Sequence, residues 1–147
     1  MGGPDQKTIL AVDDEPAVTL LIHRVLTRAG YEVRTASSGE EGLQILDKQG
    51  PVDLLIVDKN LPRMHGLEFV RRARTKLPRV PVIVITAAPE AMTGISERIE
   101  GYLAKPFRSL DALREAVAQA FERNRVARER EDLQRKLNEV VAQLRKA

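Results

Sequence analysis

Residues 53–69 read DLLIVDKNLPRMHGLEF, which combines an apolar run, an aspartate at its end, a turn and the start of a helix. The run Asp53–Val57 shows no alternation of polar and apolar residues, which is typical of a strand covered on both faces. Apolar residues at helical spacing then extend from Gly66 to Lys76. This strand–turn–helix order predicts one unit of an α/β fold.

The same unit recurs along the chain. The other expected strands are Thr8–Val12, Tyr31–Ala36, Val80–Ile85 and Tyr102–Ala104. The other expected helices are Pro16–Ala29, Ser38–Gly50, Pro89–Ile99 (weakened by Gly94) and one from Ser109 to Ala147. Five strands alternating with five helices predict a doubly wound parallel sheet. Such sheets carry their functional groups at the carboxyl ends of the strands.

Composition excludes several classes of protein. The 147 residues are 43% hydrophobic, 31% charged and 3% aromatic, and none is cysteine. Disulfides, thiolate catalysis and cysteine-based zinc sites are therefore excluded. The apolar runs are far shorter than the roughly 20 residues of a membrane span, and the first residues lack the apolar core of a signal peptide. We expect a cytoplasmic protein with no membrane contact.

The net charge of +3 lies entirely in residues 122–147, where eight basic residues are interleaved with five acidic ones. A basic surface for nucleic acid is usually less mixed with acids. We therefore expect no direct binding of nucleic acid.

Reactive side chains stand at four predicted strand ends: Asp13 with Asp14, Asp58, Thr86 and Lys105. Three clustered carboxylates repel one another unless a cation joins them. An all-oxygen ligand set favours Mg²⁺, and a carboxylate beside Mg²⁺ can act as a nucleophile toward phosphorus. The set predicts a phosphoryl-transfer site, although each residue alone could be a helix cap or an ordinary loop charge.

The chain resembles the response-regulator receiver domain of bacterial two-component signalling. The matching stretches are ILAVDDEP, TASSGEEGL, DLLIVDKNLPRMHGLEF, VIVITA and GYLAKPF, and the likeness covers about residues 6–121. It implies a flavodoxin-like sheet in the order 2-1-3-4-5 and a receiver domain over residues 1–121. The protein would be a switch rather than an enzyme, limited to its own phosphorylation and dephosphorylation.

The resemblance also implies roles for single residues. Asp58 would accept the phosphoryl group from a sensor histidine kinase or a phosphotransfer protein. Asp14 would bind Mg²⁺ directly and Asp13 largely through water, and Asp58 and the backbone carbonyl of Asn60 would complete the protein ligands.

Three further residues would take part in the switch. Lys105 would pair with the phosphoryl group next to a cis Lys105–Pro106 bond. Thr86 would swing its hydroxyl onto a phosphoryl oxygen, and Tyr102 would move into the vacated space. The changed surface would then control a partner or an output domain.

The sequence departs from the family pattern at four places without losing a reactive residue. His65 replaces an acid, and we expect a solvated loop histidine there. Lys59 directly follows the predicted acceptor. Gly42 replaces an alanine, at a cost of about 1 kcal/mol in helix propensity. The stretch from Thr86 to Lys105 is about three residues shorter than usual, so the fourth helix is expected to be truncated or irregular.

Residues 122–147 form a separate helical extension in this interpretation. Its stripe has steps of 4, 3, 4, 3 and 4, as in a coiled coil with one basic interruption: Val126, Arg130, Leu133, Leu137, Val140 and Leu144. Three interpretations stay open: a parallel homodimer, a linker to an output domain outside this chain, and a solvated charged helix.

Two other functions compete with the phosphorylated switch. A haloacid-dehalogenase-type phosphatase also uses a strand-end aspartate, Mg²⁺, a threonine and a lysine. It usually has a second aspartate two residues after the nucleophile, where this chain has Asn60. A degenerate receiver would instead be an adaptor that acts through its coiled coil.

Overall fold

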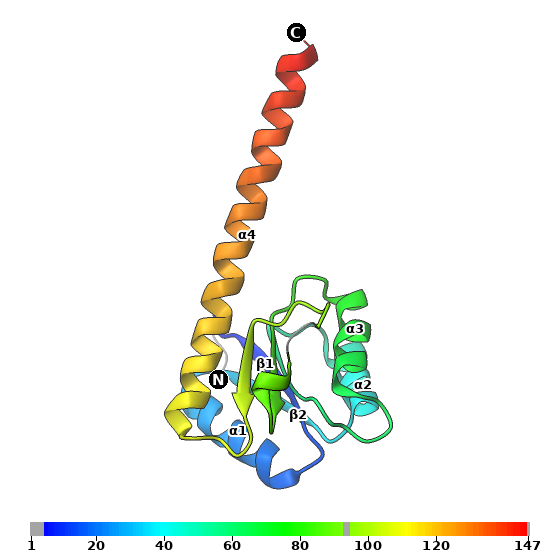
Figure 1. The fold of residues 1–147 in the computed structure, drawn as a ribbon, viewed down its shortest axis with the longest axis vertical. Coiled ribbons are helices and arrows are strands. Elements are labelled where there is room, and N and C mark those ends of the chain that lie inside the picture. The colour runs from blue at the N-terminus through cyan, green and yellow to red at the C-terminus, as the bar shows by residue number, and fades with distance from the viewer. Residues whose placement is uncertain (1–4, 93–94, 147) are drawn as a thin grey trace.

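The computed structural model describes residues 5–92 and 95–146, and it shows a layered α/β body from which one long helix projects (Figure 1). Its elements, in chain order, are β1 (Thr8–Val12), α1 (Pro16–Arg28), β2 (Glu32–Ala36), α2 (Gly39–Gln49), β3 (Leu54–Asp58), α3 (Gly66–Lys76), β4 (Val82–Thr86), the 3₁₀ turn η1 (Pro89–Ala91), β5 (Gly101–Ala104) and α4 (Leu110–Lys146).

All strand pairs are parallel, and the sheet order is β2-β1-β3-β4-β5. This confirms the predicted flavodoxin-like fold. Val12 lies beside Val57, Asp58 beside Ile85, and Thr86 beside Ala104. The carboxyl ends of β1, β3 and β4 therefore lie at one edge of the sheet, where their flanking residues can meet.

Two apolar clusters cover the two faces of the sheet. On one face, Phe69 and Val70 of α3 pack with Leu10 and Leu55. On the other, Leu26 of α1 and Leu113 of α4 join a cluster that includes Ile9 and Ile56. β3 and β4 are buried along their whole length, which explains their continuous apolar sequence. Each fully buried aliphatic side chain stabilises the fold by about 1.5–3 kcal/mol relative to an exposed one.

The predicted helix over residues 89–99 is wrong. Only the three-residue turn Pro89–Ala91 forms, and the described residues from 95 to 100 are not helical; Gly94 lies outside the described residues. Apolar residues of this segment still reach the core, because Met92 is buried and Ile95 and Ile99 pack against the α3-side cluster. A short helix is marginal without tertiary support, and here the same packing is achieved by irregular chain. The expectation that this helix is truncated or irregular is thus confirmed, because only one 3₁₀ turn of it forms.

Caps fix the helix starts. Ser38 Oγ accepts a hydrogen bond from the Glu41 amide at 3.1 Å, and Ser109 Oγ accepts one from the Ala112 amide at 3.0 Å. The Glu41 carboxylate accepts from Ser37 Oγ at 2.9 Å, which ties the first turn of α2 to the residue before its cap. Gly30, just after the end of α1, has φ 101°, a left-handed conformation that favours glycine.

One uninterrupted helix, α4, runs for 37 residues, as predicted. Its first turns pack on the sheet through Leu113, Val117 and Ala120, and its later turns project from the body (Figure 1). Among the described residues, none of the helices has the length and apolar character needed to cross a bilayer.

Candidate functional site

The predicted acidic residues lie together at the carboxyl edge of the sheet. Asp13, Asp14 and Asp58 each offer one carboxylate oxygen, and these three atoms lie within 4.8 Å of one another. Asp13 is 1% exposed and Asp58 5% exposed, whereas Asp14 is exposed. The cluster is therefore anchored in the body and reached from solvent on the side of Asp14.

The Lys105 ammonium bridges this cluster. Its Nζ lies 3.2 Å from Asp13 Oδ2 and 3.3 Å from Asp58 Oδ2, and 2.6 Å from Glu15 Oε1. The Lys105 amide donates to the Thr86 carbonyl at 3.0 Å, and the Lys105–Pro106 bond is cis, as expected. Sequence reasoning missed Glu15, although its position directly after the acidic pair, at the N-cap of α1, was a signal.

Backbone amides orient the two buried carboxylates. Asp13 Oδ1 accepts from the Glu15 amide at 2.8 Å, and Asp58 Oδ1 accepts from the Asn60 amide at 3.1 Å. Each carboxylate thus has one oxygen held by its own loop, while Oδ2 points to Lys105.

The electrostatics of the site indicate an excess of negative charge. Burial raises the pKa of Asp13, the Glu15 amide opposes this, and the charge of Asp58 adds to it. Burial alone would lower the pKa of Lys105, but hydrogen bonds to Glu15 and Asp13 and the charges of Asp13 and Asp58 raise it overall. Lys105 is therefore a fixed cation that faces more carboxylates than it can neutralise. An all-oxygen donor set with this surplus suits a hard divalent ion such as Mg²⁺.

Thr86, at the end of β4, and Tyr102, in β5, are not part of the acidic cluster. Thr86 is 3% exposed, and its Oγ1 accepts from the Ala88 amide at 3.2 Å. Tyr102 is 39% exposed. Within the described part of the chain, no hydrogen bond joins the Thr86 hydroxyl to Asp58 or Lys105; only the Thr86 carbonyl contacts Lys105, through its amide.

The loop after Asp58 is closely packed against the start of α3. A Cβ at Gly66 would lie 2.2 Å from the Asp58 carbonyl oxygen, so only glycine fits there. The Gly66 amide donates to the Lys59 carbonyl at 3.0 Å. His65 is exposed, and its Nδ1 accepts from the Leu67 amide at 3.3 Å as the N-cap of α3. His65 is thus placed as a solvated cap.

A model of the response regulator receiver domain matches residues 9–118, about three quarters of the chain. The chain belongs to the response regulator receiver family. Among curated relatives, the transcriptional regulatory protein TrcR of Mycobacterium tuberculosis is 40% identical over 108 residues, which are 71% of this chain and 41% of TrcR. The chain therefore spans less than half the length of this relative.

Solved structures of response regulators have the same fold as this receiver. The chemotaxis response regulator CheY4 of Vibrio cholerae is 32% identical, with a TM-score of 0.72 over 78% of this chain and 98% of CheY4. NtrX from Brucella abortus is 28% identical, with a TM-score of 0.78 over 86% of this chain and 29% of NtrX. The similarity to CheY4 thus extends over nearly all of that protein.

Proposed function

We propose that this receiver is a phosphorylation switch in which Asp58 accepts a phosphoryl group from a sensor histidine kinase or a phosphotransfer protein. The observation that carries the proposal is the Lys105 ammonium, 3.2 Å from Asp13 and 3.3 Å from Asp58. An ammonium held against a nucleophilic carboxylate can neutralise charge on an incoming phosphoryl group.

The residues present fit a bound Mg²⁺. Asp13, Asp14 and Asp58 would hold it together with the carbonyl of Asn60, and the ion would neutralise charge on the phosphoryl oxygens. Burial and the charge of Asp58 raise the pKa of Asp13, so a cation bound beside this carboxylate would stabilise its ionised form, which supports this assignment.

The transfer makes one bond and breaks one. An Asp58 carboxylate oxygen bonds to phosphorus as the bond from phosphorus to the donor's histidine nitrogen breaks. Lys105 then shifts from Glu15 and Asp13 toward the phosphoryl oxygens. Thr86 turns its hydroxyl from the Ala88 amide to a phosphoryl oxygen, and Tyr102 moves into the space that Thr86 leaves.

Acetyl phosphate tests the assignment directly. With Mg²⁺ present, the full chain should be labelled, and Asp58→Asn should remove the label because the nucleophile is lost. Asp53→Asn is the matched control: Asp53 directly precedes the same strand at its opposite end, where its carboxylate accepts from the Thr8 amide at 2.7 Å. This variant should retain the label. Labelling of Asp58→Asn at the wild-type level would contradict the proposal.

The competing functions have less support. Receivers are generally not enzymes, and here the residue two after Asp58 is Asn60, whose amide binds Asp58. Turnover of p-nitrophenyl phosphate would favour a phosphatase. Failure to bind Mg²⁺ and beryllofluoride would favour an adaptor with an idle phosphorylation site.

We propose residues 1–121 as the switch and residues 122–147 as the extension through which it acts, either on an output domain or by forming a homodimer. The relative TrcR is named a transcriptional regulatory protein. We propose that this chain also controls transcription, but indirectly, without contact between residues 122–147 and nucleic acid.

A further inference from the structure

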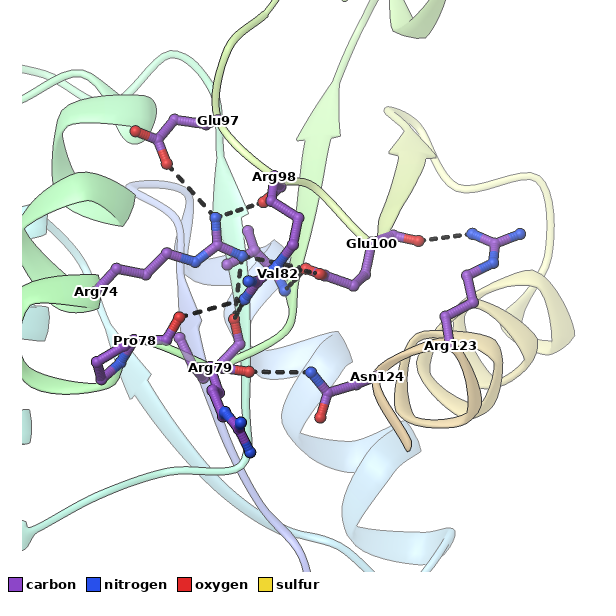
Figure 2. Close-up of polar contacts among 10 residues, drawn as sticks. Arg74, Pro78, Arg79, Val82, Glu97, Arg98, Glu100, Arg123 and Asn124 are labelled. Atoms are coloured by element: carbon purple, nitrogen blue, oxygen red, sulfur yellow. Dashed lines mark hydrogen bonds and ion pairs between the residues drawn. The ribbon is translucent and has the colours of Figure 1, made fainter. Parts of the chain in front are cut away.

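Figure 2 shows a polar cluster around Arg74 and Glu100. Glu100 directly precedes β5, whereas Lys105 directly follows it, so the cluster lies at the edge of the sheet opposite the acidic site. Its centre is Arg74 of α3, whose side chain is 11% exposed. Arg74 Nη2 donates to the Val80 carbonyl at 3.1 Å and to Glu100 Oε1 at 3.2 Å. Arg74 Nη1 contacts Glu97 Oε2 at 3.5 Å and the Arg98 carbonyl. Arg74 therefore fixes the irregular segment 95–100 that stands in place of the predicted helix.

Every polar group of Glu100 is used. Its carboxylate, 8% exposed, also accepts from the Val82 amide at 2.8 Å and from Arg98 Nε at 2.7 Å. Its amide donates to the Val82 carbonyl at 2.9 Å, and its carbonyl accepts from Arg123 Nη1 at 2.6 Å. Glu100 thus joins α3, β4 and α4 at one point (Figure 2).

The contacts with α4 occur just where its apolar packing on the body ends. After Phe121, Arg123 binds Glu100, and Asn124 Nδ2 donates to the Arg79 carbonyl at 3.0 Å. About two turns further along α4, Glu131 Oε2 lies 3.2 Å from Arg79 Nη2. These bonds form a second anchor for the helix, which would otherwise leave the body with its last support at Phe121.

A single short strand separates this anchor from the acidic site. Glu100 directly precedes β5, and Lys105 directly follows it. Among the described strands, β5 lies at the edge of the sheet and pairs with β4 alone, so one ladder of hydrogen bonds holds it there. A change in the position of Lys105 can therefore be transmitted along β5 to Glu100 and on to Arg123.

We propose that Glu100 is a positioning residue that couples Lys105, through β5, to Arg123, so that occupancy of Asp58 and the direction of the extension influence each other. This inference rests on the proposed function of Asp58. Lys105 divides its contacts among Asp13, Glu15 and Asp58, and a group on Asp58 draws it away from the first two. The helix beyond Phe121 is about 37 Å long at 1.5 Å per residue, so a small tilt at Arg123 becomes a large displacement at its end.

Coupling between two sites is reciprocal: a change at Arg123 must alter ligand affinity at Asp58. The probe is beryllofluoride with Mg²⁺, titrated by calorimetry into the full chain. Arg123→Ala should change its Kd by about threefold or more, and Arg123→Lys, which keeps a donor for the Glu100 carbonyl, should recover much of the change. The control is Arg125→Ala, because Arg125 bonds Glu122 and Glu129 of its own helix. It should leave the Kd unchanged.

The distance between two spin labels gives a second measurement. If the contact between Glu100 and Arg123 only stabilised the fold, beryllofluoride would not change this distance. The chain has no cysteine, so spin labels can be placed at Lys48→Cys in α2 and Asn138→Cys in α4, both exposed positions. Beryllofluoride should shift the distance between the labels in the otherwise native chain. The shift should be lost in Glu100→Gln, which keeps the side-chain shape but weakens the bonds to Arg74 and Arg98, and in Arg123→Ala.

The outcomes separate this inference from the function it rests on. If the native chain binds beryllofluoride but Arg123→Ala and Arg125→Ala both keep its affinity, the coupling is refuted and the switch stands. An unchanged label distance on binding refutes the coupling equally. If the native chain neither binds beryllofluoride nor accepts label from acetyl phosphate, the proposed function fails and the coupling fails with it.

Discussion

At the scale of single residues, Gly66 ties the fold to the site. A Cβ there would lie 2.2 Å from the Asp58 carbonyl oxygen and 3.0 Å from Lys59 Cα, and backbone atoms cannot move aside as a flexible side chain can. Gly66→Ala should lower the free energy of unfolding by at least about 2 kcal/mol and slow labelling by acetyl phosphate, because α3 must shift away from the Asp58 loop. Urea unfolding and the labelling rate measure both effects.

The control for this glycine is Gly101→Ala, whose added Cβ would meet only Ile83 at an ordinary 3.6 Å. It should change the free energy of unfolding by less than about 1 kcal/mol. Equal losses in the two variants would show that the close contact at Gly66 is not what matters.

Gly42 has a structural reason that the sequence did not reveal. Helix propensity alone favours alanine there by about 1 kcal/mol, but a Cβ would lie 2.7 Å from Phe69 Cε1 and 3.2 Å from Val12 Cγ2. Gly42→Ala should therefore destabilise the native chain and stabilise a Phe69→Leu background, where the ring is absent. Thermal unfolding of the four variants of this double-mutant cycle gives the coupling; additive effects would contradict the explanation.

At the scale of elements, the strands and the flanking helices could be predicted from the spacing of their apolar residues. Continuous apolar runs indicate strands buried on both faces, and apolar residues three or four apart indicate helices buried on one face. Asp13, Asp14, Asp58 and Lys105 followed from the strand ends. The failure over residues 89–99 has a physical cause: Met92, Ile95 and Ile99 have helical spacing, yet they pack equally well from irregular chain. Arg74 was invisible for another reason, since its partner Glu100 is 26 residues away and nothing in the local sequence distinguishes Arg74 from Arg71 or Arg72.

The start of α3 gives a prediction about His65. As an N-cap it makes one long hydrogen bond, 3.3 Å from Nδ1 to the Leu67 amide, whereas asparagine is among the best N-cap residues. His65→Asn should raise the free energy of unfolding by up to about 1 kcal/mol and leave Mg²⁺-dependent labelling unchanged. Loss of labelling with normal folding would mean that His65 takes part in the site after all.

At the scale of the whole molecule, α4 presents two faces with different surroundings. One lines a cleft of about 830 Å³ against the base of the body, with Phe121, Arg125 and Arg128 among its residues. Another carries the predicted seam, and its apolar members are exposed: Val126 45%, Leu133 66%, Leu137 56%, Val140 52% and Leu144 70%. Since the seam is not used by the body, a second copy can approach it without disturbing the base of the domain.

Burying this seam is the strongest driving force available for a homodimer through the extension, because each exposed leucine contributes about 1.5–3 kcal/mol when fully buried. Leu133→Glu with Leu137→Glu should leave the chain monomeric in sedimentation experiments at high micromolar concentration, where the native chain should dimerise. Asn138→Glu with Ala142→Glu adds the same charge to the same helix outside the seam, and this control should still dimerise. A native chain that sediments as a monomer under these conditions would instead assign the extension to another partner. Arg130, the one charged residue of the seam, would then be the residue that prevents the helices of two copies from pairing.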